Sequence, residues 1–171
     1  MAITIPQISI DEVYISVLKA KLVKNEEGWS KMVPVDHAVR PSGSIIVDAL
    51  VALLHEKRVY YPTEVAEYFQ KKTRDLDGAI RVLTGMPLPR FMVLYRLRQV
   101  QEYLCCTSLT AIEIATRCGY PNSSTMGYLF RKEFGMTPGT YRQAHRPRNY
   151  NEYMRGKMDM ALCLCVPFFV F

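Results

Sequence analysis

Apolar residues recur at three- and four-residue steps through most of the chain after residue 43, which is the spacing of one face of an α-helix. The first such helix starts after Ser44, an N-cap residue, and has Lys57 and Arg58 in its last turn, where the helix dipole favours cations. The residues expected on its buried face are Ile46, Ala49, Leu50, Leu53 and Leu54.

Two shorter helices follow. Pro62 cannot continue the preceding helix, and Thr63 is expected to cap a helix that runs to Gln70. Residues 75–83 form the next helix, which ends at Gly85. The inner faces are expected to be Val65, Ala66 and Phe69 in the one, and Leu76, Ala79, Ile80 and Leu83 in the other.

A longer helix is predicted to begin with Pro87 and Pro89, because proline is tolerated in the first turn, and to reach about Cys105. Beyond it, Thr110 followed three residues later by Glu113 is a capping box, which marks the start of another helix. The buried stripe of the long helix is expected to be Phe91, Val93, Leu97, Val100 and Leu104.

Residues 1–43 are less regular. Ser9 is expected to start a helix that ends near residues 25–28, and the prolines of residues 31–43 indicate a linker. Two roles are open for this arm, an interaction segment or an extension packed on the rest of the chain, and the packed extension is favoured. The helix is expected to place Val13, Val17, Leu18 and Leu22 on one face.

Residues 111–142 carry the features of a helix-turn-helix in order. Gly119 provides the residue that tolerates positive φ in the turn, Tyr120 folds back into the core, and Asn122 or Ser123 caps the second helix. The alternative is an ordinary helical hairpin with a polar surface. The expected inner residues are Ile112, Ile114, Ala115, Met126, Leu129 and Phe130, and the expected outer ones are Ser123, Ser124, Gly127, Tyr128 and Arg131.

This stretch resembles the DNA-binding region of the AraC/XylS transcription regulators. The resemblance extends more weakly upstream, to about residue 44, and leaves residues 1–43 and those after Pro147 outside. The residues that carry it are Ile112, Ala115, Gly119, Tyr120, Ser123, Phe130, Arg131, Lys132, Phe134, Gly135, Thr137, Pro138, Tyr141 and Arg142.

The resemblance implies an all-α fold of two helix-turn-helix subdomains, which are homeodomain-like three-helix units joined by a linker helix. The chain then divides into an N-terminal extension over 1–43, a DNA-binding domain over 44–147 and a tail over 148–171. Within the domain, the first motif covers 63–85, the linker helix 88–105 and the second motif 111–134. The extension is too short for the β-barrel sensor that many relatives carry.

The same resemblance implies a transcription regulator that binds double-stranded DNA with a recognition helix in successive major-groove segments, and RNA polymerase is a further candidate partner. The first motif departs from the family pattern, since Gln70 and Lys72 replace the usual turn glycine and cap serine. Asp77 and Gly78 are expected to face outward there, where a carboxylate opposes phosphates and a glycine offers no side chain. The second motif is therefore expected to dominate.

Charge is compatible with an anionic partner, because residues 62–147 hold twelve Lys and Arg against seven Asp and Glu. A solvated basic surface is the alternative for any one of these residues. Base readout is assigned to Ser123, Ser124 and Tyr128. The other expected DNA-binding residues are Lys71, Lys72, Arg74, Arg81, Arg131, Lys132 and Arg142.

Other chemistry is not indicated. The five cysteines follow no zinc-ligand spacing, and no catalytic, metal or cofactor site is expected. An odd cysteine count without an export signal indicates a cytoplasmic protein. The apolar tail over 160–171 is too short to span a membrane. Docking on the core is favoured for it, and binding of a partner or contact with a membrane surface are the alternatives. The rival function is a protein-interaction module on a degenerate helix-turn-helix scaffold.

Overall fold

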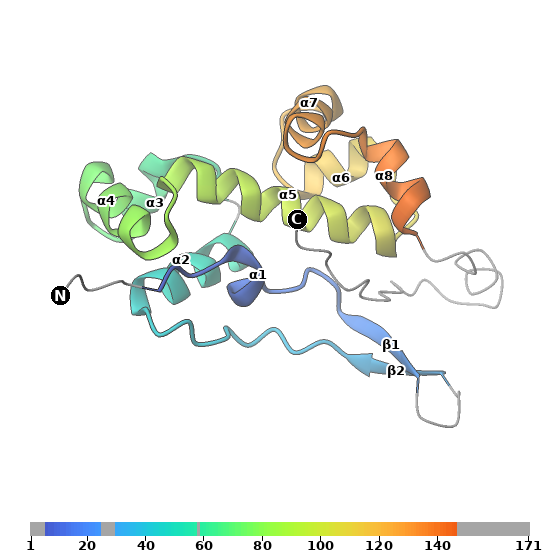
Figure 1. Cartoon of the computed structure of the whole chain (residues 1–171), viewed down its shortest axis with the longest axis horizontal. Helices are drawn as coiled ribbons and strands as arrows, with labels where there is room; N and C mark the ends of the chain where they lie inside the picture. Colours follow the sequence, from blue (N-terminus) through green and yellow to red (C-terminus); the bar gives the residue numbers. More distant parts are fainter. Residues whose placement is uncertain (1–5, 25–29, 58, 147–171) are drawn as a thin grey trace. The chain divides into compact units, whose positions relative to one another are not determined.

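The computed structural model describes residues 6–24, 30–57 and 59–146, and in these residues it confirms the predicted helical class. Figure 1 shows eight helices and one short pair of strands in this part of the chain. The elements are α1 (Ile10–Val13), β1 (Ala20–Lys24), β2 (Ser30–Pro34), α2 (Ile45–Glu56), α3 (Pro62–Tyr68), α4 (Thr73–Thr84), α5 (Leu88–Cys106), α6 (Ala111–Arg117), α7 (Ser123–Phe134) and α8 (Pro138–His145).

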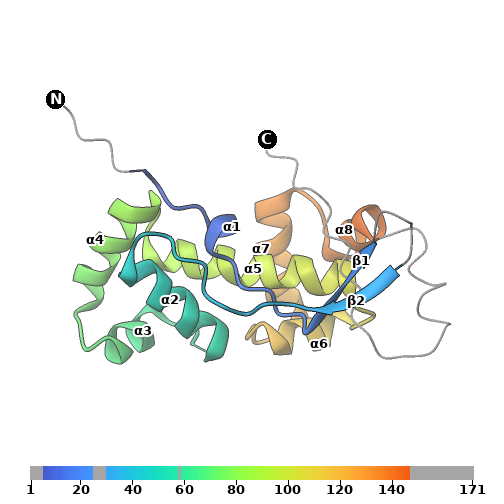
Figure 2. The ribbon, with the colours of Figure 1, turned by 90° about the horizontal axis from the view of Figure 1, so that it is seen from below.

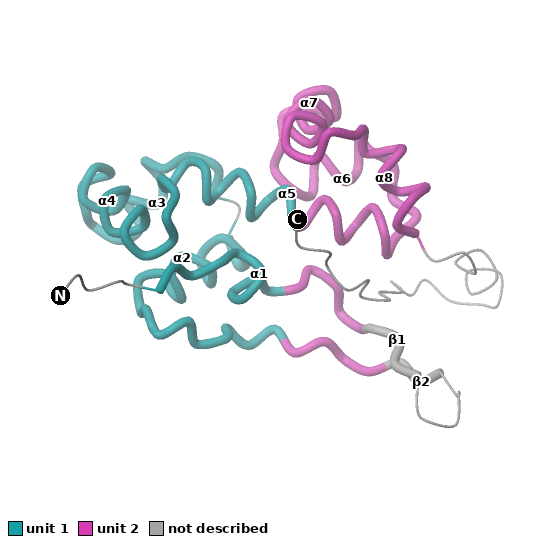
Figure 3. The backbone as a smooth tube through the Cα atoms, in the orientation of Figure 1, with its two compact units in different colours: residues 1–15, 37–98 teal, residues 16–36, 99–171 magenta. Residues whose placement is uncertain are grey.

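The chain divides into two compact units, coloured separately in Figure 3. Unit 1 comprises residues 1–15 and 37–98, and unit 2 comprises residues 16–36 and 99–171. Helix α5 contributes its first part to unit 1 and its last part to unit 2. Each unit therefore combines part of the N-terminal arm with a group of helices.

The core of unit 1 is aliphatic and aromatic, and it brings α2, α3 and α4 together with the first half of α5. The predicted face of α2 is wrong at Ile46, which is 42% exposed, whereas Val47 and Val51 are buried. The helix starts at Ile45, so the buried stripe is Val47, Leu50, Val51 and Leu54, with Leu53 beside it. Other buried members are Val65, Leu76, Ile80, Leu88, Phe91, Met92 and Tyr95.

Unit 2 buries the inner faces of α6 and α7 together with the second half of α5. Phe130 is fully buried, with its ring centroid 4.6 Å from that of Phe134 and 5.2 Å from that of Tyr141. The prediction that Ile112 faces inward is wrong, because its side chain is 69% exposed. Helix α6 has only seven residues, and the adjacent residues Ile114 and Ala115 form its buried side. The remaining buried residues include Val100, Leu104, Cys106, Cys118, Tyr120 and Met126.

The N-terminal arm differs most from its prediction. The helix that starts after Ser9 stops at Val13, and the chain then forms an antiparallel hairpin of β1 and β2, seen in Figure 2. The predicted helix over 9–25 and the first part of the predicted linker are therefore wrong. A short apolar run fits a helix or a strand equally well, and only the pairing of Ala20 with Pro34 and of Lys24 with Ser30 distinguishes them.

The arm is nevertheless a packed extension, as favoured. Val13 and Ile15 belong to the core of unit 1, and Leu18 packs on Cys106 in unit 2. In unit 2, the half-exposed loop at Ser16 is also tied to α5, since the hydroxyl of Ser16 donates to the carboxylate of Glu102 at 2.6 Å. Buried apolar residues and a buried carboxylate thus hold the arm to α5.

Among the described residues, no helix has the length and apolar character needed to cross a membrane. Within the same residues, His, Cys, Asp and Glu nowhere gather in a group of three or more that could hold a metal ion. Cys105 is half-buried, and Cys106 and Cys118 are buried. The apolar tail, Cys163, Cys165 and Arg58 lie outside the described residues.

Candidate nucleic-acid interface

The second helix-turn-helix is built as its sequence predicts. Thr110 caps α6, since its hydroxyl accepts from the amide of Glu113 at 3.3 Å, while the Glu113 carboxylate accepts from the amide of Thr110 at 2.8 Å. These hydrogen bonds to Thr110 hold the pKa of Glu113 below its ordinary value. The turn passes through Gly119 at φ +73°, and the amide of Tyr120 then donates to the carbonyl of Ala115 at 2.8 Å.

Asn122 is the N-cap of α7, which resolves the choice between Asn122 and Ser123. Its side-chain oxygen accepts from the amide of Thr125 at 2.7 Å, so Ser123 becomes the first residue of the helix. Near its C-terminal end the helix exposes Arg131 and Lys132. Gly135 ends the helix at φ +71°, and its amide donates to the carbonyl of Arg131.

The first helix-turn-helix, α3 and α4, repeats this backbone with different side chains. Gln70 occupies the turn at φ +53°, in the left-handed region that glycine prefers, and the amide of Lys71 donates to the carbonyl of Ala66 at 2.9 Å. Lys72 stands at the N-cap and makes no side-chain capping bond. The prediction that Thr63 caps α3 is wrong, because Tyr61 is the N-cap and Pro62 is the first residue of the helix.

The two recognition helices have equal length, twelve residues, and both end at a glycine of positive φ. Aligned on Gly85 and Gly135, their buried positions correspond as Leu76 with Met126 and Ile80 with Phe130. The outward positions then correspond as Arg74 with Ser124, Asp77 with Gly127, Gly78 with Tyr128, and Arg81 with Arg131.

The outward face of α7 carries residues predicted for both base and phosphate contacts. Ser124, Tyr128 and Arg131 are exposed and recur at four- and three-residue steps, so they lie on one side of the helix. Tyr128 is 67% exposed, a high value for an aromatic side chain in a folded unit. Lys132 is exposed beside this row, and Ser123 is half-buried at its start. The structure thus brings together all five residues predicted on this helix.

The outward face of α4 is basic and sparse. Lys71 and Lys72 are exposed in the turn, and Arg74 and Arg81 are exposed on the helix. Gly78 lies between the two arginines, and a Cβ atom added there would meet nothing within 4 Å. The four predicted residues of this motif therefore share one surface, which has charge but few groups that could distinguish bases.

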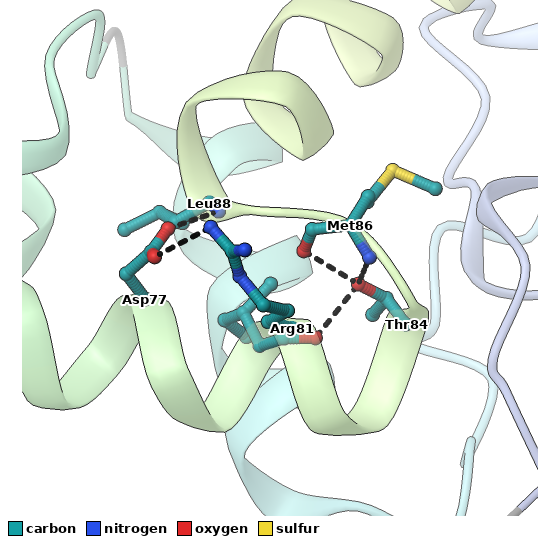
Figure 4. A network of polar contacts seen from close by, with 6 residues as sticks. Asp77, Arg81, Thr84, Met86 and Leu88 are labelled. Carbon is teal, nitrogen blue, oxygen red and sulfur yellow. Dashed lines mark hydrogen bonds and ion pairs between the residues drawn. The ribbon is translucent and has the colours of Figure 1, made fainter.

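Asp77 corrects the prediction that it faces outward toward a bound polyanion. One of its carboxylate oxygens accepts from the amide of Leu88 at 2.8 Å, and the other lies 3.5 Å from the Arg81 guanidinium, as Figure 4 shows. Leu88 begins α5 directly after Pro87, which has no side-chain acceptor. Asp77 thereby caps α5 from another helix and is half-buried. The sequence signal for this role is that Pro87, which precedes α5, has no side chain that could cap the helix, so the cap must come from another segment.

Arg142 is held by the protein's own backbone. Its Nε donates to the carbonyl of Leu104 at 3.3 Å, and a terminal nitrogen donates to the carbonyl of Leu109. Arg146 likewise donates to the carbonyl of Thr107. Because Leu104 is in the last turn of α5, whose carbonyls lack helical partners, these arginines fasten α8 to the end of α5. The structure thus gives Arg142 a structural contact with the backbone, and its predicted phosphate contact stays a prediction.

The predicted interface residues fall into two sets, one in each unit. Lys71, Lys72, Arg74 and Arg81 belong to unit 1, and Ser123, Ser124, Tyr128, Arg131 and Lys132 belong to unit 2. The set in unit 1 lies on α4 and in the turn before it, and the set in unit 2 lies on α7.

The sequence is similar to a known protein family and to several transcriptional activators. Residues 65–144 match a family described as a helix-turn-helix domain. The transcriptional activator RhaR of Cronobacter sakazakii is 31% identical over 63% of this chain and 41% of its own length. The transcriptional activator RhaS of Yersinia pestis is 31% identical over 49% of this chain and 30% of its own length. The chain thus spans less than half the length of these relatives.

Solved structures share the fold. The C-terminal domain of AraT, a response regulator from Geobacillus stearothermophilus, has a TM-score of 0.57 at 24% identity and covers 63% of this chain and 91% of that domain. The DNA-binding domain of the transcriptional factor AdpA, solved in complex with a target DNA, has a TM-score of 0.54 at 23% identity. It covers 66% of this chain and 97% of that domain.

Proposed function

Through this domain the chain belongs to the AraC/XylS family, and from that premise we propose that it regulates transcription by binding double-stranded DNA. The observation that carries the proposal is that the chain has two helix-turn-helix motifs, each with an exposed face on its second helix, α4 or α7. Helices of this kind enter the major groove, where side chains meet base edges and phosphates.

The two faces are proposed to do different work. On α7, Ser123, Ser124 and Tyr128 are the base-reading residues, since hydroxyls bond base edges and an aromatic edge meets the thymine methyl group. Arg131 and Lys132, near the end of the same helix, bind phosphates. Sequence preference therefore resides mainly in α7.

On α4, Lys71, Lys72, Arg74 and Arg81 are proposed to bind the DNA backbone. Asp77 does not oppose this role, because its carboxylate accepts from Leu88 and pairs with Arg81. The rival proposal is a protein-interaction module, in which the degenerate first motif no longer binds DNA and the arm and tail engage a protein. A positive strip broken at Asp77 would favour it, and the bonds of Asp77 to Leu88 and Arg81 weaken that one ground.

The proposal extends to a protein partner and a cellular location. The matched relatives RhaR and RhaS are named transcriptional activators, so RNA polymerase is the proposed protein partner. A cytoplasmic location follows from a role on DNA in such regulators. Transcription from a template that carries the selected site, measured with and without the protein, tests activation. An unchanged transcript level would contradict it.

Binding itself is tested by selecting DNA from a random pool and then measuring fluorescence anisotropy on the selected site. We expect saturable binding to the selected site and weaker binding to a shuffled one, with affinity falling steeply as salt increases. Absence of binding to any duplex at low salt would contradict the proposal.

The roles on α7 are separated by two variants of exposed residues. Arg131→Ala should weaken binding about equally on selected and shuffled DNA and lower the slope of log affinity against log salt by about 1, because one phosphate contact is lost. Ser124→Ala should weaken binding to the selected site and leave binding to shuffled DNA unchanged. Equal effects of the two variants on every sequence would remove the division of roles.

A further inference from the structure

Unit 1 holds two histidines side by side, and neither belongs to its recognition helix α4. His37 lies in the extended segment before α2, and His55 lies in the last turn of α2. Nδ1 of His37 is 3.4 Å from Nε2 of His55, and the ring centroids are 5.5 Å apart with planes tilted by 53°. His37 is exposed and His55 is half-buried, so ions from solvent can reach the pair.

The separation of the two nitrogens fits a shared metal ion better than a direct hydrogen bond. An N–H donor and an oxygen acceptor usually lie about 2.7–3.2 Å apart, and the nitrogen–nitrogen separation here is longer, at 3.4 Å. Two imidazole nitrogens at about 2.0–2.1 Å from a tetrahedral zinc ion are about 3.3–3.4 Å from each other. The pair therefore already has the spacing of two zinc ligands.

The backbone on both sides holds the pair in place. Val39 packs against the core of unit 1, and in an extended segment residues 37 and 39 point to the same side. On α2, the buried Val47 and Val51 lie at four-residue steps before His55, so His55 continues the same stripe of the helix. The amide of Ser42 donates to Asp48 at 2.9 Å and fastens the end of the segment to α2.

We propose that His37 and His55 form a surface site for Zn²⁺, which clamps the segment before α2 onto that helix. Imidazole nitrogen is a preferred ligand of Zn²⁺. The described residues offer no group of three or more His, Cys, Asp and Glu around one point, so water completes the coordination. The site is thus a two-ligand clamp, weaker than the four-ligand sites that zinc-dependent folds use.

The test is titration of the full chain with Zn²⁺ by calorimetry, in a Cys163→Ser, Cys165→Ser background that removes the two tail thiols. We expect one ion per chain, and loss of binding in both His37→Gln and His55→Gln. His145→Gln is the matched control, because the third histidine of the chain stacks on Tyr141 in unit 2, at 3.9 Å between ring centroids. This control variant should bind Zn²⁺ as the parent does.

A second measurement follows the imidazole signals of the parent by NMR during the titration. Signals of His37 and His55 should shift together, and those of His145 should stay. Absence of binding, equal binding in His37→Gln, or shifts confined to His145 would overturn the proposal. Since His37 is exposed, its variant decides the question even where His55→Gln disturbs α2.

Discussion

The two helix-turn-helix motifs solve the same structural problem with different residues. In the second motif each special position has the residue that suits it locally, with Gly119 in the turn, Asn122 at the cap and Thr137 capping α8. In the first motif Gln70 takes the left-handed turn, Lys72 offers no capping bond, and Asp77 caps α5 from within α4. One motif is determined by neighbours in sequence, and the other depends on contacts between helices.

This difference has a consequence for the interface. Asp77 occupies the position that Gly127 has in the second motif, and its carboxylate is engaged by the amide of Leu88 and by Arg81. The first motif therefore has a basic face made of a few long side chains, whereas the second adds hydroxyl and aromatic groups. The unequal faces support unequal roles, and the following predictions test the comparison.

The largest expected effect is on the cores of the two motifs. Phe130→Ala should cost about 3–5 kcal/mol of unfolding free energy, because it removes a fully buried ring that contacts two others. Ile80→Ala at the corresponding position should cost about 2–5 kcal/mol and fall below Phe130→Ala. Urea unfolding followed by circular dichroism measures both. A larger loss for Ile80→Ala would show that the aromatic core is not the stronger one.

Removal of the capping carboxylate comes next. Asp77→Ala should cost about 1–3 kcal/mol, because the amide of the buried Leu88 loses its acceptor. Asp77→Asn is the matched control, since its side-chain oxygen still accepts and the exposed pair with Arg81 contributes little. Thr137→Ala, which removes the local cap of α8, should cost about 1 kcal/mol.

The outward glycines should behave alike in stability and differently in binding. Ala at Gly78 or at Gly127 meets no atom within 4 Å and should add about 1 kcal/mol of stability through helix propensity. Gly127→Ala should in addition change the preferred DNA sequence, whereas Gly78→Ala should leave it unchanged. Thermal unfolding and a repeated selection experiment measure these effects. The same change of preference in both variants would contradict a dominant α7.

The smallest expected effect is that of Gln70→Gly, in the turn of the first motif. Gln70→Gly should stabilise the chain by about 0.5–1 kcal/mol, because relief of the left-handed conformation slightly exceeds the added freedom of glycine in the unfolded chain. Gly119→Ala should destabilise it by about 1–2 kcal/mol for the same conformational reason. A loss of stability in Gln70→Gly would mean that the Gln70 side chain contributes more than its strained backbone costs.

The amino-acid sequence by itself determined the helical class and the second motif, because the signals for both are local. Glycine in the turn, the Thr110 and Glu113 capping box and the apolar steps of the helices depend on residues within one or two turns of each other. The outward row of α7 followed from the same periodicity. The assignment of its members to bases or phosphates stays a prediction until binding is measured.

Only the tertiary structure decided the features that join distant segments. Residues 20–24 and 30–34 became paired strands, because strands obtain their hydrogen bonds from a partner that periodicity does not reveal. Asp77 and Arg142 make structural contacts that their sequence neighbours do not reveal. Asp77 accepts from a helix end eleven residues away, and Arg142 donates to two carbonyls more than thirty residues away. A charged side chain binds whichever partner the fold places within hydrogen-bond distance, and the residues next to it in sequence do not determine which partner that is.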